Sequence, residues 1–344
     1  MNHSQWEILK RCANMEEMQE VPVGLIVDSP WIPGHVNMPT IDYFTMTDKW
    51  LNANIKVIND FPEVIFLPGF WVEYGMALEP SAFGCKIEFF ESTTPNINHI
   101  IASTEDVSRL KVPNPKTDGL MPFALSIYKN IEPKIKDKGY CIKTVAARGP
   151  LTLASHLMGL TNFLIGLKTD PENTQKFIKI TTKTVKEWLE AQAEILSEVE
   201  GIMVLDDIVG FLSKEDYLEF AHPYMKEIFE AFPNCIKMYH NDTDNIVFMP
   251  YLEDLKVNIF NFTHLRDVCK VRELVGDKVC LLGNVAPLDV LTKGDYNTVK
   301  DAAQEIIKSH GKKGLILSAG GGTSPGTPGG NISALIDAAK VKFY

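Results

Sequence analysis

The sequence predicts an α/β protein with the architecture of a (β/α)8 TIM barrel. Short apolar runs recur along the 344 residues and alternate with helix-type patterns. Runs of roughly four to eight apolar residues without strict alternation are typical of strands buried on both faces, as in parallel sheets. Eight runs of this kind lie at residues 21–28, 64–67, 142–147, 202–207, 236–240, 257–262, 279–283 and 315–319. This number of strands is the one that the barrel requires.

The segments between these runs carry helix signals. Apolar side chains recur at steps of three and four residues in 171–199, and Asp170 with Pro171 supplies a cap and a first-turn proline. Ser213 opens another helix in the same manner, and Pro223 kinks or restarts it. No internal repeat or low-complexity linker divides the chain. We therefore expect an N-terminal helical extension, residues 1–20, and a single barrel domain, residues 21–344.

Composition and charge exclude several classes of partner. A formal charge of -10 and a pI near 5.4 argue against nucleic acid or an anionic membrane, since both favour a basic face. No segment approaches the roughly 18 apolar residues of a membrane span, and the first residues do not read as a signal peptide. The six cysteines are scattered, without a Cys-x-x-Cys pair, which is typical of reduced thiols. These features predict a cytoplasmic protein whose partner is a small molecule or another protein.

Polar residues that end the apolar runs are the first candidates for a site, because barrel enzymes build their active sites at the carboxyl ends of the strands. His240 and Asp242 end one run, and imidazole nitrogen and carboxylate oxygen both bind zinc. Asp206 and Asp207 end the preceding run, and neighbouring strands lie about 4.8 Å apart. A hydrogen-bonded histidine beside a turn-forming aspartate gives the same local pattern. The metal hypothesis therefore depends on whether the carboxylates of the preceding strand end approach His240. Other strand ends supply Asp28, Arg148, Asn261, His264 and Asn284.

Aromatic and glycine residues mark further strand ends. Trp31 follows the first run, and Phe70, Trp71 and Tyr74 follow the second. Such rings wall pockets for flat substrates, or they form core under a long loop. Three glycines, Gly320, Gly321 and Gly322, follow the last run. They let a backbone pass close to a ligand, with a flexible surface loop as the alternative.

Four motifs together resemble the uroporphyrinogen decarboxylase superfamily, which also contains corrinoid-dependent methyltransferases. They are Ala-Arg-Gly-Pro-Leu-Thr-Leu-Ala at 147–154, Leu-Ser-Lys-Glu-Asp-Tyr at 212–217, Leu-Gly-Asn-Val-Ala-Pro at 282–287 and Gly-Thr-Ser-Pro-Gly-Thr-Pro at 322–328. The decarboxylases carry arginines after the first strand, where this chain has Asp28 and Trp31, and a histidine where it has Gly321. The resemblance therefore points away from porphyrinogen decarboxylation.

Other members of the superfamily bind zinc. The coenzyme M methyltransferases do so through His-x-Cys and a later cysteine; His240 matches their histidine, while Asp242 and Gly321 stand at the two cysteines. Methyltransferases of anaerobic O-demethylase systems are associated with the spacing Glu-x14-Glu-x20-His, of which Glu219 and His240 fit the second part. Val204 stands at the first glutamate, so the resemblance to this branch is partial.

The resemblance implies a methyltransferase that cleaves an aryl methyl ether with the help of zinc. The methyl group passes to the cob(I)alamin of a partner corrinoid protein, as in an O-demethylase. Asp207 and His240 are the implied catalytic residues. The implied zinc ligands come from Asp206, Asp207, Glu219, His240 and Asp242. The implied substrate-binding residues are Trp31, Phe70, Trp71, Tyr74 and Asn284. The implied place of approach for the corrinoid is formed by Gly320, Gly321 and Gly322.

Two alternatives stay open. One is a corrinoid methyltransferase of the same fold for another small donor, such as a methylamine, a methylthiol or a methanol-derived group. The other is a non-catalytic binding protein of the barrel family, in which Gly321 marks a lost site.

Overall fold

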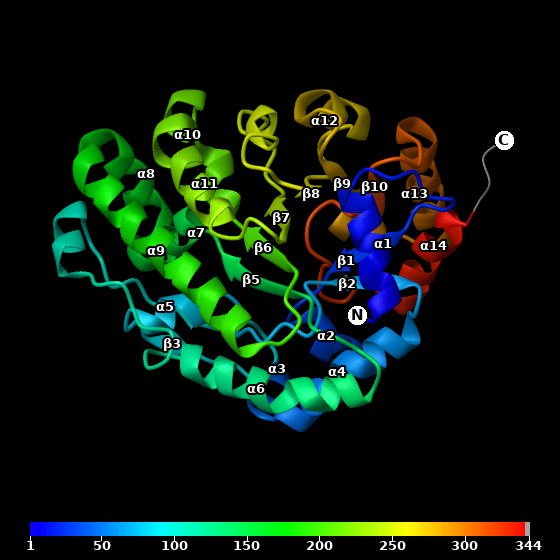
Figure 1. Ribbon diagram of the computed structural model, residues 1–344, viewed down its shortest axis with the longest axis horizontal. Coiled ribbons are helices and arrows are strands. Elements are labelled where there is room, and N and C mark those ends of the chain that lie inside the picture. Colours follow the sequence, from blue (N-terminus) through cyan, green and yellow to red (C-terminus); the bar gives the residue numbers. More distant parts are fainter. Residues whose placement is uncertain (341–344) are drawn as a thin grey trace.

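A parallel sheet of eight strands forms the centre of the protein in a computed structural model that describes residues 1–340 (Figure 1). The strands are β1 (Val23–Ile26), β2 (Val64–Leu67), β5 (Thr144–Arg148), β6 (Gly201–Leu205), β7 (Ile236–Asn241), β8 (Ile259–Phe262), β9 (Cys280–Val285) and β10 (Leu315–Ala319). Their order is β2-β1-β10-β9-β8-β7-β6-β5, and the sheet curls into a nearly closed barrel. Each predicted apolar run forms one strand, which confirms the TIM barrel.

Helices surround the barrel on its outer side (Figure 1). They are α2 (Trp31–His35), α3 (Thr40–Thr45), α4 (Thr47–Asp60), α5 (Leu78–Ala82), α6 (Met121–Asp137), α7 (Pro150–Met158), α8 (Leu160–Thr169), α9 (Pro171–Ile195), α10 (Lys214–Phe220), α11 (His222–Glu230), α12 (Val268–Val275), α13 (Tyr296–His310) and α14 (Gly329–Ala339). Short helical turns are η1 (Thr104–Arg109), η2 (Asp207–Phe211), η3 (Met249–Tyr251) and η4 (Pro287–Thr292), and β3 (Ile87–Glu88) pairs with β4 (Asn96–Ile97).

The predicted helix starts are confirmed. The side chain of Asp170 accepts a hydrogen bond from the backbone of Asn173 and caps α9, and Ser213 caps α10 in the same way through Asp216. A new helix, α11, begins beside Pro223.

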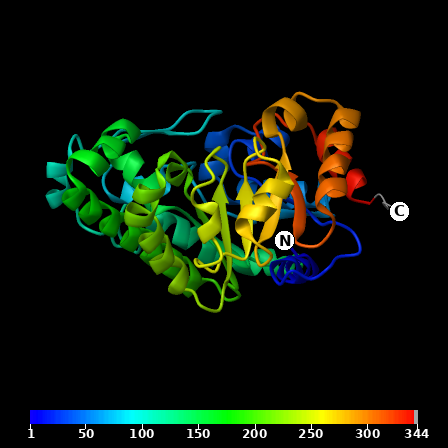
Figure 2. The same ribbon diagram turned by 90° about the horizontal axis from the view of Figure 1, so that it is seen from above.

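The helix α1 (His3–Ala13) covers the amino ends of the strands (Figure 2). The indole of Trp6 donates a hydrogen bond to Glu200 at 2.8 Å, just before β6, and the Gln5 amide donates to the Val64 carbonyl at 3.0 Å, at the start of β2. Because this end is covered, the carboxyl ends of the strands form the mouth of the barrel. The helix lies within the predicted extension, residues 1–20; the domain boundary itself stays a prediction.

The strand period of two decides which side chains enter the barrel. Met203 and Leu205 of β6 and Met238 of β7 belong to the buried cluster that also contains Trp6 and Leu9 of α1. The alternate residues of these strands, such as Val204, belong to the cluster between the sheet and the helices. Side chains two residues beyond an inward-facing residue therefore continue toward the mouth.

Within residues 1–340 no single helix is both long and apolar enough to cross a membrane. Taken together, α7 and α8 have the length and the apolar composition of a membrane span, although the two helices are bent by 106° relative to each other. All six cysteines are free thiols.

Candidate metal centre

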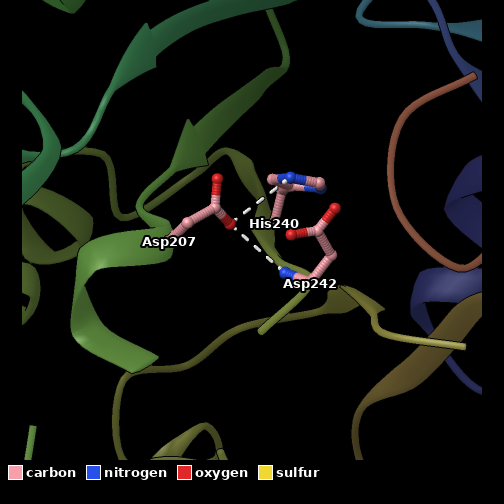
Figure 3. Close-up of side chains that lie close together, drawn as sticks. All are labelled: Asp207, His240 and Asp242. Atoms are coloured by element: carbon pink, nitrogen blue, oxygen red, sulfur yellow. Dashed lines mark hydrogen bonds and ion pairs between the residues drawn. The ribbon is translucent and has the colours of Figure 1, made fainter. Parts of the chain in front are cut away.

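Three side chains meet at the mouth of the barrel, namely Asp207, His240 and Asp242 (Figure 3). One nitrogen or oxygen atom from each lies within 4.8 Å of the other two. The His240 Nε2 atom is 3.5 Å from Asp207 Oδ1, which also accepts a hydrogen bond from the backbone N–H of Asp242 at 3.2 Å. The structure thus brings together three of the five predicted zinc ligands, including both predicted catalytic residues.

Strand alternation explains why these residues converge. Leu205 points into the barrel, and Asp207 follows it by two residues. Met238 points inward on the next strand, and His240 and Asp242 follow at the same period. Leu205 and His240 lie in register between β6 and β7. The two strand ends therefore deliver their side chains to one place.

Asn261 of β8 fixes the orientation and the tautomer of His240. Its Nδ2 donates to the backbone carbonyls of Leu282 at 2.8 Å and Ala319 at 3.2 Å, which can only accept. Its Oδ1 must therefore face His240 Nδ1, at 2.6 Å, and accept a hydrogen bond from it. With the proton held on Nδ1, the lone pair of Nε2 faces Asp207 and is free to bind a metal.

Burial distinguishes the members of the triad. The His240 side chain is 8% exposed, whereas the Asp207 side chain is 37% exposed. Burial raises the pKa of Asp242, the nearby imidazole of His240 opposes this shift, and the charge of Asp207 adds to it. Two carboxylates and one imidazole, partly withdrawn from water, form a nitrogen and oxygen donor set that suits zinc or a harder divalent ion. The residues present therefore fit the implied metal.

Gly321 lets Asp242 occupy its place. Its φ angle is +126°, and a Cβ atom on it would lie 2.5 Å from Asp242 Oδ2. At Gly320 a Cβ would lie 2.4 Å from the backbone nitrogen of His264, whereas at Gly322 it would meet nothing within 4 Å. Close packing thus requires Gly320 against the backbone of His264 and Gly321 against Asp242 of the triad; the role of the three glycines in the approach of a corrinoid stays a prediction.

Asp206 and Glu219 lie apart from the triad. Asp206 continues the outward face of β6, and its carboxylate accepts hydrogen bonds from the backbone N–H groups of Leu151 and Thr152, at 2.9 and 3.0 Å, and from the Thr152 hydroxyl at 2.8 Å. It caps the start of α7, although burial raises its pKa to about 7 against the effect of these donors. Glu219 is exposed on α10 and accepts a hydrogen bond from Gln175.

The predicted substrate-binding residues have different surroundings. Trp31 donates a hydrogen bond to the Thr327 carbonyl, and Phe70 is 1% exposed between Trp50 and Tyr140, so both pack as core. Tyr74 lines a groove with Phe44 and Phe89. The Asn284 amide donates to the carbonyls of Thr263 and Arg266, which fixes the loop after β8. Trp71 forms a cation–π contact with Arg148, a charged group of the mouth.

A second set of charged side chains lies at the ends of β1, β2 and β5. Arg148 is 3.8 Å from Asp28, and both were candidates by position. Glu73 and Glu79 were missed. Glu73 accepts a hydrogen bond from the Ser29 backbone at 3.1 Å, and Glu79 accepts one from the Arg148 backbone at 3.0 Å. The sequence contained a signal for both, because they are the two acidic residues of the largely apolar and aromatic stretch that follows β2.

Known proteins are similar to this chain over most of its length. The sequence profile of the uroporphyrinogen decarboxylase (URO-D) family matches residues 38–341. A uroporphyrinogen decarboxylase from Trichodesmium erythraeum is 25% identical over 313 residues, which cover 87% of this chain and 85% of that protein. A methylated-thiol–coenzyme M methyltransferase from Methanosarcina mazei is 24% identical over 270 residues, covering 78% of this chain and 71% of that protein.

A solved structure has the same fold. A methyltransferase from Methanosarcina mazei superposes with a TM-score of 0.82 at 20% identity, over 96% of each chain. Fold and site thus define a TIM-barrel enzyme with a candidate metal centre at its mouth. The chain belongs to the uroporphyrinogen decarboxylase family, as its motifs predicted.

Proposed function

We propose that this protein is a corrinoid-dependent methyltransferase that demethylates an aryl methyl ether. The observation that carries the proposal is the donor set of Asp207, His240 and Asp242, which contains nitrogen and oxygen but no sulfur. In the coenzyme M methyltransferases that the sequence resembles, sulfur-containing donors hold a zinc ion that activates a thiol, whereas nitrogen and oxygen donors make the ion a harder Lewis acid that favours an oxygen substrate. The similarity to methyltransferases in sequence and fold supports the same class of reaction.

In the proposed reaction, the bond between the methyl carbon and the ether oxygen breaks, and the methyl group passes to cob(I)alamin carried by a partner protein. Asp207, His240 and Asp242 would hold zinc; when bound, zinc supplies Lewis acidity to the departing phenolate oxygen. Asn261 keeps the proton on His240 Nδ1, so that Nε2 would be free to bind the zinc ion. Gly321 leaves room for Asp242 at the mouth, where the partner must reach the substrate.

The test combines purified protein, cob(I)alamin and a panel of methyl donors, with the visible spectrum of methylcobalamin as the signal. We expect methyl transfer from methoxybenzenes, and joint loss of bound zinc and of transfer in His240→Ala. His222→Ala is the matched control, because His222 lies on the outer helix α11, where its ring pairs with the carboxylate of Asp254. Full transfer by His240→Ala without zinc would contradict the proposal.

One relative favours a second candidate function. The methylated-thiol methyltransferase from Methanosarcina mazei makes a thioether the next donor to test. Transfer from methylated thiols, with none from methoxybenzenes, would replace the first proposal by this one. Absence of both metal and transfer with every donor would favour a non-catalytic binding protein.

A further inference from the structure

The side chain of Arg148 is buried, and its guanidinium group has no hydrogen-bond partner in the described part of the chain. Arg148 is only 6% exposed, and its Nε atom is fully buried and unpaired. Among residues 1–340 the guanidinium donates no hydrogen bond, and the nearest carboxylate oxygen, on Asp28, is 3.8 Å away. A guanidinium offers five N–H donors in a planar fork, and leaving a fully buried donor such as this Nε–H unpaired costs a protein stability. The arrangement therefore leaves donors that are available to the acceptors of a ligand.

The surroundings of Arg148 hold its side chain in place. Its guanidinium carbon lies 4.9 Å from the centre of the Trp71 ring, a cation–π contact. Its backbone N–H donates to Glu79, which fixes the end of β5. The fork is thus positioned by stacking and by the backbone, while its Nε–H donates to no residue within 1–340.

Three acidic side chains lie around this cation, yet none forms a close pair with it. Burial raises the pKa of Asp28 and Glu79, and it raises that of Glu73 to about 8. The Arg148 charge opposes each of these shifts. The nearest of these carboxylates, that of Asp28, is 3.8 Å from the guanidinium, so the acids leave its N–H donors without a hydrogen bond.

Arg148 faces the same space as the metal centre. Ala146 of β5 and Ile26 of β1 point into the barrel, and Arg148 and Asp28 follow them by two residues. The carboxylate of Asp28 interacts electrostatically with both Arg148 and His240. A small molecule at the mouth therefore has the cation of Arg148 on the β5 side and the triad on the β6 and β7 side.

We propose that Arg148 binds a carboxylate carried by the aromatic substrate. This inference rests on the proposed function and specifies its substrate class as a methoxylated aromatic acid. A carboxylate matches the planar fork with two parallel hydrogen bonds, and the adjacent Trp71 ring offers a face for stacking the aromatic ring. With its acid end on Arg148, the substrate extends its methoxy group toward Asp207, His240 and Asp242.

Calorimetric binding to the purified protein tests this without turnover. The probes are para-methoxybenzoate and para-methoxybenzamide, which have the same shape and differ in charge. We expect the benzoate to bind about tenfold to a hundredfold more tightly, the loss expected when a charge-assisted hydrogen bond is removed. Arg148→Gln should abolish that difference, and Arg148→Lys should keep only part of it. Arg109→Gln, which removes an arginine that is 82% exposed, should leave it unchanged.

Equal affinity for the two probes, no binding of the benzoate, or unchanged benzoate affinity in Arg148→Gln would overturn the inference. Thermal melting of each variant shows whether it is folded. The proposed function fails separately: benzoate binding through Arg148 without methyl transfer contradicts the methyltransferase and keeps the anion site. Transfer from neutral methoxybenzenes as efficient as from the acid contradicts the anion site and keeps the methyltransferase.

Discussion

Replacement of Gly321 by alanine should damage the metal centre by moving Asp242. The new Cβ would lie 2.5 Å from Asp242 Oδ2, whereas ordinary contacts begin at 3.4 Å, so the carboxylate must shift by about 1 Å. Metal sites tolerate distance errors of only about 0.2 Å, and we expect zinc affinity to fall about tenfold to a hundredfold. The φ angle of +126° adds strain of about 1–3 kcal/mol to the folded state.

The neighbouring glycine supplies the control. Gly322→Ala introduces the same methyl group where nothing lies within 4 Å, so its zinc affinity should equal that of the wild type. Zinc affinity is measured by competition with a chelating dye, and the free energy of unfolding of the metal-free proteins by urea titration. Wild-type zinc affinity in Gly321→Ala would refute the claim that Asp242 is a ligand held in place by this glycine.

Four further substitutions each change a single side chain. Asp206→Ala removes the acceptor that caps the start of α7, so it should lower the free energy of unfolding by about 1–3 kcal/mol and leave the zinc content unchanged. Asp207→Asn should do the opposite: it should reduce the zinc content with little effect on urea unfolding. Asn261→Leu removes the acceptor of His240 Nδ1 and should weaken zinc binding about tenfold to a hundredfold, measured by chelator competition. Burial raises the pKa of Glu73 to about 8 in the folded state, whereas the pKa is near 4.5 in the unfolded chain. The free energy of unfolding should therefore fall by a few kcal/mol as the pH rises between these two values. Glu73→Gln should remove this pH dependence, measured by urea titration at several pH values.

Each of these has a clear contrary result. Loss of zinc in Asp206→Ala would make this residue a ligand after all. Unaltered zinc affinity in Asn261→Leu would show that the tautomer is fixed by something else. A wild-type pH slope in Glu73→Gln would mean that another buried acid, such as Asp28 or Glu79, causes it.

The barrel was predictable because its signal is local and repeated. Each strand is a short apolar run, and the helix starts carry caps such as Asp170 and Ser213, so neither requires knowledge of distant contacts. The triad was predictable for a related reason, since His240 and Asp207 end neighbouring strands. The alternation of the strand also separates Asp207 from Asp206, because successive residues point to opposite faces.

Other features of the site depend on contacts that no local pattern contains. Asn261 fixes His240 through carbonyls of two further strands, and Phe70 is core because Trp50 and Tyr140 enclose it. The unpaired Nε–H of Arg148 is a property of the folded environment, which becomes visible only when the acceptors around it have been placed.

X-ray absorption at the zinc edge of the zinc-loaded protein tests the central claim most directly. We predict a first shell of nitrogen and oxygen only, with one imidazole, because His240, Asp207 and Asp242 are the donors that the fold brings together. The same signal should be lost in His240→Ala. Sulfur in the first shell, or an unchanged imidazole signal in that variant, would contradict the assignment of the metal centre.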